Sequence, residues 1–233
     1  MNMNNVNAIF QKALKDFMAN MSMLVLPVLP IVIAWLYNQT VETAGEVSMP
    51  IEMIYTIIAM AFAAVMFMSI ATMFAEENEK HTLRGLLQSP ASIIDIIVGK
   101  VIVSLFITLV SLAIALFIVD GYEILKPIDY LGMFLFMIVI IFMGVAVGLV
   151  SKSVGTVSAY SLPVMFGLVF SPMINNFVEE GHVLRTVVDY LPVNAMVNLH
   201  NEFAWQPILV LLGWIVAMAI LALIVISRAK KDD

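Results

Sequence analysis

Six long apolar stretches constrain this chain more than any other feature of its sequence. A helix needs about 20 mostly apolar residues to cross the hydrocarbon core of a bilayer, and each stretch reaches that length. They cover residues 18–37, 53–75, 93–119, 130–150, 157–176 and 207–227. Hydrophobic residues make up 62% of the chain, compared with about 45–50% in soluble domains. The sequence therefore predicts an all-α polytopic membrane protein, in which residues 1–233 form a single domain with six transmembrane helices.

The first apolar stretch also resembles a signal peptide, because Lys12 and Lys15 precede it. A cleaved signal peptide is the alternative to a membrane span there. However, no small-residue cleavage pattern follows, and Trp35 and Tyr37 are typical of side chains at a membrane interface. We interpret this stretch as a retained span.

The basic residues predict the orientation of the chain. Cytoplasmic loops of membrane proteins are enriched in Lys and Arg. With six spans, nine of the 11 basic residues fall on one side, namely Lys12, Lys15, Lys80, Arg84, Lys100, Lys152, Arg228, Lys230 and Lys231. Only Lys126 and Arg185 fall on the other side. Both termini are therefore expected in the cytoplasm, and Lys100 is expected to extend from the third span to the cytoplasmic interface.

The loops on the predicted outer side are acidic. They include Glu42, Glu52, Asp120, Glu123, Asp129 and Glu202. Acidic residues contribute little to orientation. These carboxylates either attract a cationic substrate or are solvated loop charges.

Residues 76–90, EENEKHTLRGLLQSP, interrupt the apolar pattern on the predicted cytoplasmic side. Pro90 cannot continue a helix, and Ser92 to Asp95 have the pattern of a capping box that starts the third span. Residues 79–89 are therefore predicted to form a separate short helix. Its Leu83, Leu86 and Leu87 form an apolar stripe, which either lies on lipid headgroups or enters a groove on a cytoplasmic partner.

The sequence lacks the residues that several classes of function require. No G-x-x-x-x-G-K-[ST] motif occurs, so the chain is not expected to hydrolyse ATP alone. The three histidines have no metal-ligand spacing. Ion-coupled carriers usually place Asp, Glu or His at membrane depth, and the spans hold almost none. We expect no catalytic residue, no metal site and no nucleic-acid partner, and we expect the energy for any transport to come from another subunit.

Prolines interrupt two of the predicted spans. Pro27 and Pro30 are expected to kink the first span, because each removes a backbone donor. The fifth span contains Pro163 and Pro172 together with several polar side chains, including Ser158, Tyr160, Ser161, Ser171 and Asn175. These polar residues either line a substrate pathway or a subunit contact, or they satisfy the carbonyls that the prolines leave free.

Two further patterns concern packing at other places in the chain. Gly144 and Gly148 form a small-xxx-small surface, which we assign to packing within the chain rather than to dimerisation. Residues 177–206 contain apolar residues at helical spacing on both sides of Pro192. Two short amphipathic helices on the outer leaflet, which would form a lid over an exit, would explain that spacing.

The chain resembles the ABC-2-type permeases, which are membrane subunits of one class of ATP-binding-cassette exporters. The most specific part of the resemblance is residues 76–100, where acidic residues precede a Thr-Leu, a Leu-Leu pair, a Ser-Pro and a Gly-Lys. The matching residues are Thr82, Leu83, Leu86, Leu87, Ser89, Pro90, Gly99 and Lys100. His81 stands where the family usually has glycine. YLPVNAM, residues 190–196, resembles the proline-centred motif before the family's last span.

The resemblance implies a coupling helix that docks on a separate ATPase subunit, which would hold ATP and Mg²⁺; this chain would bind no cofactor itself. The residues assigned to that contact are Glu79, Lys80, His81, Thr82, Leu83, Arg84, Leu86 and Leu87. It also implies a second permease copy, either identical or a close paralogue, in the plasma membrane of a bacterium. An interfacial N-terminal helix with Phe10, Leu14 and Phe17 would brace the joint, and the first, second and fifth spans would line the route.

The function expected from these features is ATP-driven export of an amphipathic or hydrophobic substrate, such as a peptide, a drug or a lipid-like molecule. An ion-coupled secondary transporter and a non-transporting membrane scaffold or sensor are the alternatives.

Overall fold

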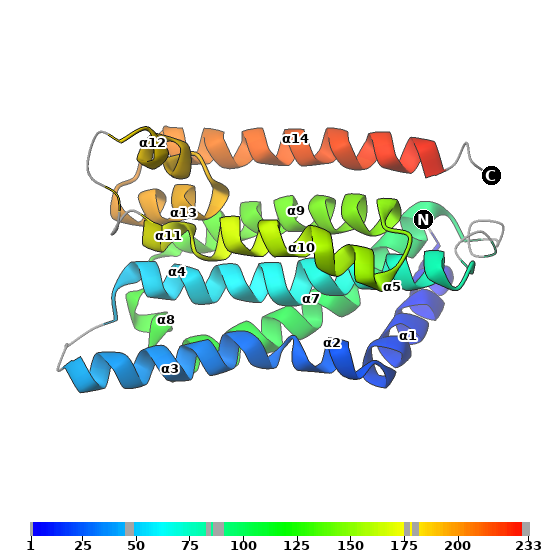
Figure 1. The fold of residues 1–233 in the computed structure, drawn as a ribbon, viewed down its shortest axis with the longest axis horizontal. Coiled ribbons are helices and arrows are strands. Elements are labelled where there is room, and N and C mark those ends of the chain that lie inside the picture. The colour runs from blue at the N-terminus through cyan, green and yellow to red at the C-terminus, as the bar shows by residue number, and fades with distance from the viewer. Residues whose placement is uncertain are drawn as a thin grey trace.

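The computed structural model describes residues 2–44, 49–82, 85, 91–174, 178 and 182–229. Every regular element within these ranges is a helix. The long helices run side by side along the long axis of the molecule, whereas the N-terminal helix α1 crosses that direction obliquely at one end (Figure 1). The elements are α1 (Met3–Ala19), α2 (Met21–Val25), α3 (Val28–Ala44), α4 (Ile51–Met60), the π-helical segment η1 (Ala61–Phe67), α5 (Met68–Glu79), α7 (Ile93–Ile118), α8 (Gly121–Ile124), α9 (Pro127–Val150), α10 (Val154–Val169), α11 (Ser171–Ile174), α12 (Val183–Asp189), α13 (Pro192–Asn201) and α14 (Trp205–Ala229).

Five helical stretches in the described residues are long and apolar enough to cross a membrane. They are Met21–Thr43, Ile51–Glu79, Ile93–Ile118, Pro127–Val150 and Trp205–Arg228. These stretches correspond to the predicted first, second, third, fourth and sixth spans. The chain is therefore a multi-pass membrane protein made of helices, as the sequence predicted.

The predicted fifth span is not one continuous helix. Its first part, α10, has 16 residues and ends at Val169, and α11 follows after Phe170. Pro172 lacks the backbone N–H that would bond the Leu168 carbonyl, and the Ser171 hydroxyl donates to that carbonyl instead, at 3.0 Å. The count of six spans remains a prediction, because neither piece alone has the length of a span.

The first span begins and ends later than the sequence suggested. Asn20 separates α1 from α2, since its side-chain oxygen accepts the backbone N–H groups of Ser22 and Met23. Residues 18 and 19 therefore belong to α1, and the span extends through polar residues as far as Thr43. The predicted kink is present between Val25 and Val28, where the Ser111 hydroxyl of α7 donates to the Pro27 carbonyl at 2.5 Å.

The second span is the centre of the bundle. In the most apolar part of Ile51–Glu79, 94% of the residues are buried inside the chain. It packs against α3, α7, α9, α10 and α13, and Figure 1 shows it running between α3 on one side and α9 and α10 on the other. The resemblance implied that this span lines the transport route, but within one chain its surface is covered by other helices.

Two glycines of α9 explain how closely that helix approaches the central span. A Cβ atom on Gly148 would lie 2.8 Å from Phe74 Cβ, and one on Gly144 would lie 3.1 Å from Ile70 Cβ. Both contacts are within the chain, as predicted for the small-xxx-small surface.

The segment before the last span contains α12 and α13, but the two helices have different surroundings. α13 is buried along most of its length and contacts α4, α9 and α14. By contrast, Val183, Leu184 and Val187 of α12 are exposed. The sequence predicted that both helices would present an apolar face to the outer leaflet, whereas only α12 has an exposed apolar face.

Candidate functional site

The end of α5 is connected to most of the bundle through four consecutive residues. Glu76 accepts a hydrogen bond from Asn20 at the α1–α2 junction. Glu77 binds α1 and α7, Asn78 binds the end of α9, and Glu79 binds the start of α10. We call residues 76–79 the junction segment. It leads into the segment 79–89 that the sequence predicted as a coupling helix and shares Glu79 with it.

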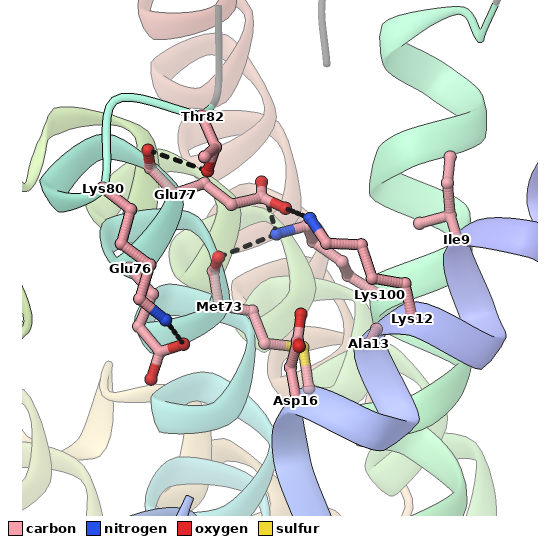
Figure 2. A pocket seen from close by; sticks show the side chains of 10 residues that line it. All are labelled: Ile9, Lys12, Ala13, Asp16, Met73, Glu76, Glu77, Lys80, Thr82 and Lys100. Carbon is pink, nitrogen blue, oxygen red and sulfur yellow. Dashed lines mark hydrogen bonds and ion pairs between the residues drawn. The ribbon is translucent and has the colours of Figure 1, made fainter. Parts of the chain in front are cut away.

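Glu77 lies between two lysines from different helices. Its Oε1 is 2.8 Å from Lys12 Nζ of α1, and its Oε2 is 2.7 Å from Lys100 Nζ of α7. Lys100 also donates to the Met73 carbonyl at 2.7 Å and lies 4.4 Å from the centre of the Phe74 ring. Its side chain is only 3% exposed, so the predicted extension to the membrane interface is wrong. The Glu77 carboxylate and the Met73 carbonyl hold this lysine inside the protein (Figure 2).

A cavity of about 160 Å³ lies beside this cluster. Figure 2 shows its wall, which α1 and the end of α5 build together with Lys100. The charged residues on it are Lys12, Asp16, Glu76, Glu77, Lys80 and Lys100. Three are acidic and three are basic, so the wall is balanced in charge and suits a joint between helices better than a site for an anion.

Asn78 and Glu79 hold the turn between α9 and α10. The Asn78 amide donates to the carbonyls of Ser151 at 2.9 Å and Leu149 at 3.2 Å, which are among the carbonyls that a helix end leaves without partners. Glu79 Oε2 accepts the backbone N–H of Val154, the first residue of α10, at 3.0 Å. A carboxylate at a helix N-terminus is stabilised by the helix dipole.

The junction segment ends in a left-handed turn. The N–H of Thr82 donates to the Glu77 carbonyl at 2.8 Å, and the N–H of His81 donates to the Asn78 carbonyl at 3.1 Å. This pair of bonds is a Schellman motif, with His81 at the left-handed position (φ 54°) that glycine normally occupies. His81 therefore keeps the turn in which a glycine would be unstrained.

Helix α1 packs on α7 through a close contact. Its buried face consists of Val6, Ile9, Ala13 and Phe17. A Cβ on Gly99 would lie 2.7 Å from Ile9 Cγ2 and 3.2 Å from the Val6 carbonyl oxygen, so only glycine permits this distance. Phe10 and Leu14, which the sequence assigned to the interfacial helix with Phe17, are partly buried beside this face.

The N-terminal ends of α1 and α7 are also joined. Ser92 and Asp95 form the predicted capping box, with Ser92 N 3.0 Å from Asp95 Oδ2. The other oxygen, Asp95 Oδ1, accepts the backbone N–H of Asn2 at 3.0 Å. One carboxylate therefore caps α7 and holds the start of α1.

A family model described as ABC-2 family transporter protein matches residues 2–228. This chain belongs to the ABC-2 transporter family. A comparison with curated proteins gave no match. ABC-2 permeases are membrane transport components and are not themselves catalytic, and the Gly-Lys pair of the motif now has a structural explanation. Gly99 admits α1, and Lys100 binds Glu77.

The predicted coupling residues of this ABC-2 permease fall partly within the described residues. Glu79 is the last residue of α5, and Lys80, His81 and Thr82 form the exposed turn. The predicted start of a separate helix at residue 79 is therefore wrong, since α5 continues to that residue before the Schellman motif ends it. Leu83, Arg84, Leu86 and Leu87 lie outside the described residues.

The candidate pathway residues of the permease do not gather at one place. Pro27 lies between α2 and α3, and Pro30 lies in the first turn of α3, which continues without a break there. Ser171 begins α11 at the far end of the bundle (Figure 1). Ser158 and Ser161 donate to carbonyls of their own helix, four residues earlier. Tyr160 is half exposed on the outer surface of α10, and Asn175 lies outside the described residues. Only Ser171 satisfies a carbonyl that a proline leaves free, that of Leu168 four residues before Pro172. Ser158 and Ser161 bond the carbonyls of Val154 and Val157 instead of the Ala159 carbonyl that Pro163 leaves free.

Proposed function

We propose that this ABC-2 permease is the membrane subunit of an exporter driven by a separate ATP-hydrolysing subunit, which binds the segment after α5. The observation that carries the proposal is the junction segment. Its four residues contact the α1–α2 junction, α1 and α7, the end of α9 and the start of α10. A displacement applied at Lys80–Thr82 would therefore reach most of the bundle at once.

The proposed mechanism is a switch between two packings. ATP binding would draw two ATPase subunits together, and each would move the segment that it holds. The Glu77 ion pairs would carry this movement to α1 and α7, and the breaks at Pro27 and near Pro172 would allow the spans to change their angles. Packed helices shift between discrete arrangements rather than deforming smoothly.

The contact with the ATPase would combine apolar anchors and exposed charges. Leu83, Leu86 and Leu87 would supply the buried area, as anchors in interfaces usually do. Lys80, whose side chain is 69% exposed, and Arg84 would fix the register at the rim. Glu79 already accepts the backbone N–H of Val154 in α10, so we do not assign it to the contact with the ATPase.

The experiment that tests the proposal substitutes the leucine pair. Leu86→Asp with Leu87→Asp should abolish ATP-dependent export in reconstituted vesicles and reduce co-purification of the ATPase. The matched control is Val183→Asp with Val187→Asp, two exposed apolar residues on α12, which should leave the ATPase bound. Wild-type export by the leucine double variant, with the ATPase still attached, would refute the proposal. Flux that persists without ATP under an ion gradient would instead support a secondary transporter, and no flux at all would support a scaffold or sensor.

We propose further that two permease copies assemble in a bacterial plasma membrane with both termini in the cytoplasm, and that a peptide is the first substrate to test. The distribution of basic residues supports the orientation. The exposed apolar residues of α12 and the acidic composition of the predicted outer loops support an amphipathic, cationic substrate. Uptake of labelled cationic and neutral peptides of equal length into inverted vesicles would separate charge from hydrophobicity as the basis of selection.

A further inference from the structure

A buried carboxylate lies at the opposite end of the bundle from the junction segment. Asp129, in the first turn of α9, is 1% exposed. Its Oδ2 accepts the backbone N–H of Lys126 at 2.6 Å and lies 2.8 Å from His200 Nδ1 at the end of α13. The sequence placed Asp129 among solvated or substrate-attracting loop charges, and its burial shows that it is neither.

Three helices meet at this carboxylate. Tyr55 of α4 faces Asp129, and its ring lies edge-on to the His200 ring with the centres 6.2 Å apart. Lys126 Nζ donates to the His200 carbonyl oxygen at 2.6 Å. His200 therefore joins the last turn of α13 to both α4 and α9.

Among the residues that the structure describes, the rest of α13 is held mainly by apolar packing. Val193, Met196 and Leu199 are buried, and Gly132 of α9 allows Met196 to approach closely. Apolar contacts do not change with pH. The polar contact of His200 is the part of this attachment that responds to a proton.

The charge of the His200 ring determines how well Asp129 is compensated. A carboxylate buried without an opposite charge is costly, and a charged donor makes a hydrogen bond roughly twice as strong as a neutral donor does. The Lys126 ammonium is bonded to a carbonyl rather than to Asp129. Protonated His200 would supply the positive charge, and its place in the last turn of α13 also favours a cation there.

We propose that His200 and Asp129 form a proton-dependent latch that holds α13 against α4 and α9. Histidine is the side chain that ordinarily changes charge between about pH 5 and 8. The latch is closed when His200 is protonated, and it loosens as the ring loses its proton. In the described part of the chain, the titratable or charged groups that face the ring are Asp129, Tyr55 and Lys126, and none of these three side-chain types ordinarily titrates in that interval.

The absence of cysteine in this chain permits a direct test on the purified permease in detergent. A single cysteine is introduced at buried Val197 (Val197→Cys), and a second protein carries it at exposed Asn198 (Asn198→Cys). The ratio of their maleimide labelling rates cancels the effect of pH on the thiol itself. We expect this ratio to rise about tenfold from pH 5.5 to pH 8, the change that corresponds to a 1.4 kcal/mol difference.

Two histidine variants test whether the pH dependence of the labelling ratio comes from the latch. His200→Gln keeps a neutral donor, so the ratio should be high at both pH values. His182→Gln changes another histidine near α13, at the start of α12, and should preserve the full pH dependence. A ratio that does not change with pH in the parent protein, or that changes equally in His200→Gln, would overturn the proposal.

If His200→Gln does not fold, the proposal can still be tested by a measurement that leaves His200 unchanged. The chain has three histidines, so their rings can be followed by NMR of protein labelled with ¹⁵N-histidine, with His81→Gln and His182→Gln used for assignment. The midpoint of the labelling change must coincide with the titration of His200; coincidence with another ring would exclude the latch. Both tests need no ATPase and no substrate, so their outcome is independent of the proposed function.

Discussion

Glu77 is placed between the ammonium groups of Lys12 and Lys100, and only Lys12 reaches solvent. The Lys12 side chain is 45% exposed, compared with 3% for Lys100. Removing the carboxylate would therefore leave one buried positive charge without a counter-charge. Such an uncompensated charge is far more destabilising than the loss of a surface pair.

We expect Glu77→Gln to lower the free energy of unfolding by about 3 kcal/mol, measured by denaturant titration in detergent micelles. Lys80→Gln, which removes an exposed lysine near Glu76, should change it by less than about 1 kcal/mol. Glu77→Leu combined with Lys100→Met removes both buried charges and should recover much of the loss. Equal effects of Glu77→Gln and Lys80→Gln would contradict the buried cluster.

His81 provides a second prediction at this scale. Its φ of 54° costs a side-chain-bearing residue about 1 kcal/mol, so His81→Gly should raise stability by roughly that amount. Lys80→Gly, at an ordinary φ of −83°, should be destabilising by about 0.5–1 kcal/mol. Thermal unfolding of the two glycine variants checks the difference in sign, and a fall in stability for His81→Gly would rule out the Schellman turn.

The sequence indicated which residues of the site matter but not what they contact. The motif pointed to Thr82, Gly99 and Lys100. The partner of Lys100 could not be predicted, because local spacing does not specify which helix packs beside it. Lys12 precedes Glu77 by 65 residues, and nothing in either local pattern indicates the pair. Asn20 was missed, although an asparagine between two apolar helical patterns is a signal for a cap.

At the scale of helices, the contact between α1 and α7 depends on Gly99. The ideal Cβ position is within 3 Å of Ile9, so alanine there would force the two helices apart. We expect Gly99→Ala to destabilise the protein by about 1–3 kcal/mol and to weaken export by loosening α1. Both effects are measured on the same preparation, by unfolding in detergent and by flux in vesicles.

A matched glycine on another helix separates packing from helix propensity. Gly213 of α14 has no atom within 4 Å of its ideal Cβ, so Gly213→Ala should be neutral or stabilising by up to about 1 kcal/mol. Ile9→Ala in the Gly99→Ala background should restore part of the stability. Destabilisation of equal size by both glycine variants would show that the close approach of α1 is not the cause.

The positions of helices could be predicted better than their interruptions. Periodicity and the Ser92–Asp95 capping box located α7 within a residue or two. An interruption of the fifth span by Pro163 and Pro172 was predicted, but its position at Phe170 was not, because the apolar run continues through that residue and α10 continues through Pro163. A buried polar face on α7 was also missed. It consists of Lys100, Ser104, Thr108 and Ser111 at helical spacing, and all four are buried.

At the scale of the whole molecule, a labelling experiment tests whether α10 and α11 together cross the membrane. Single cysteines at exposed Lys15, Lys152 and Asn198 should report the side of the membrane when intact cells are treated with an impermeant maleimide. We expect Lys15→Cys and Lys152→Cys to be protected and Asn198→Cys to react. Protection of both Lys152→Cys and Asn198→Cys would mean that α10 and α11 do not cross, and would contradict the six-span prediction.

The membrane class and most of the spans followed from composition and length, whereas the arrangement of the spans did not. Apolar character does not rank helices by burial, because a lipid-facing helix is as apolar as one that faces protein. The last span is more apolar than the second and yet far less buried. The better signal lay in the small residues of the second span, since Ala59, Ala61, Ala63, Ala64 and Ala71 are all completely buried and let neighbouring helices approach.

The central position of Ile51–Glu79 has a consequence for biosynthesis. The ribosome completes this segment before α7, α9, α10 and α13 exist, so the sides that these helices later cover must first face lipid. Thr56 is suited to that interval, because its hydroxyl bonds the Glu52 carbonyl of the same helix at 2.7 Å and needs no partner from a later segment. Glu77 is not suited to that interval, because its partner Lys100 is synthesised only afterwards. Membrane insertion of this permease therefore passes through a stage in which Lys12 alone neutralises that carboxylate.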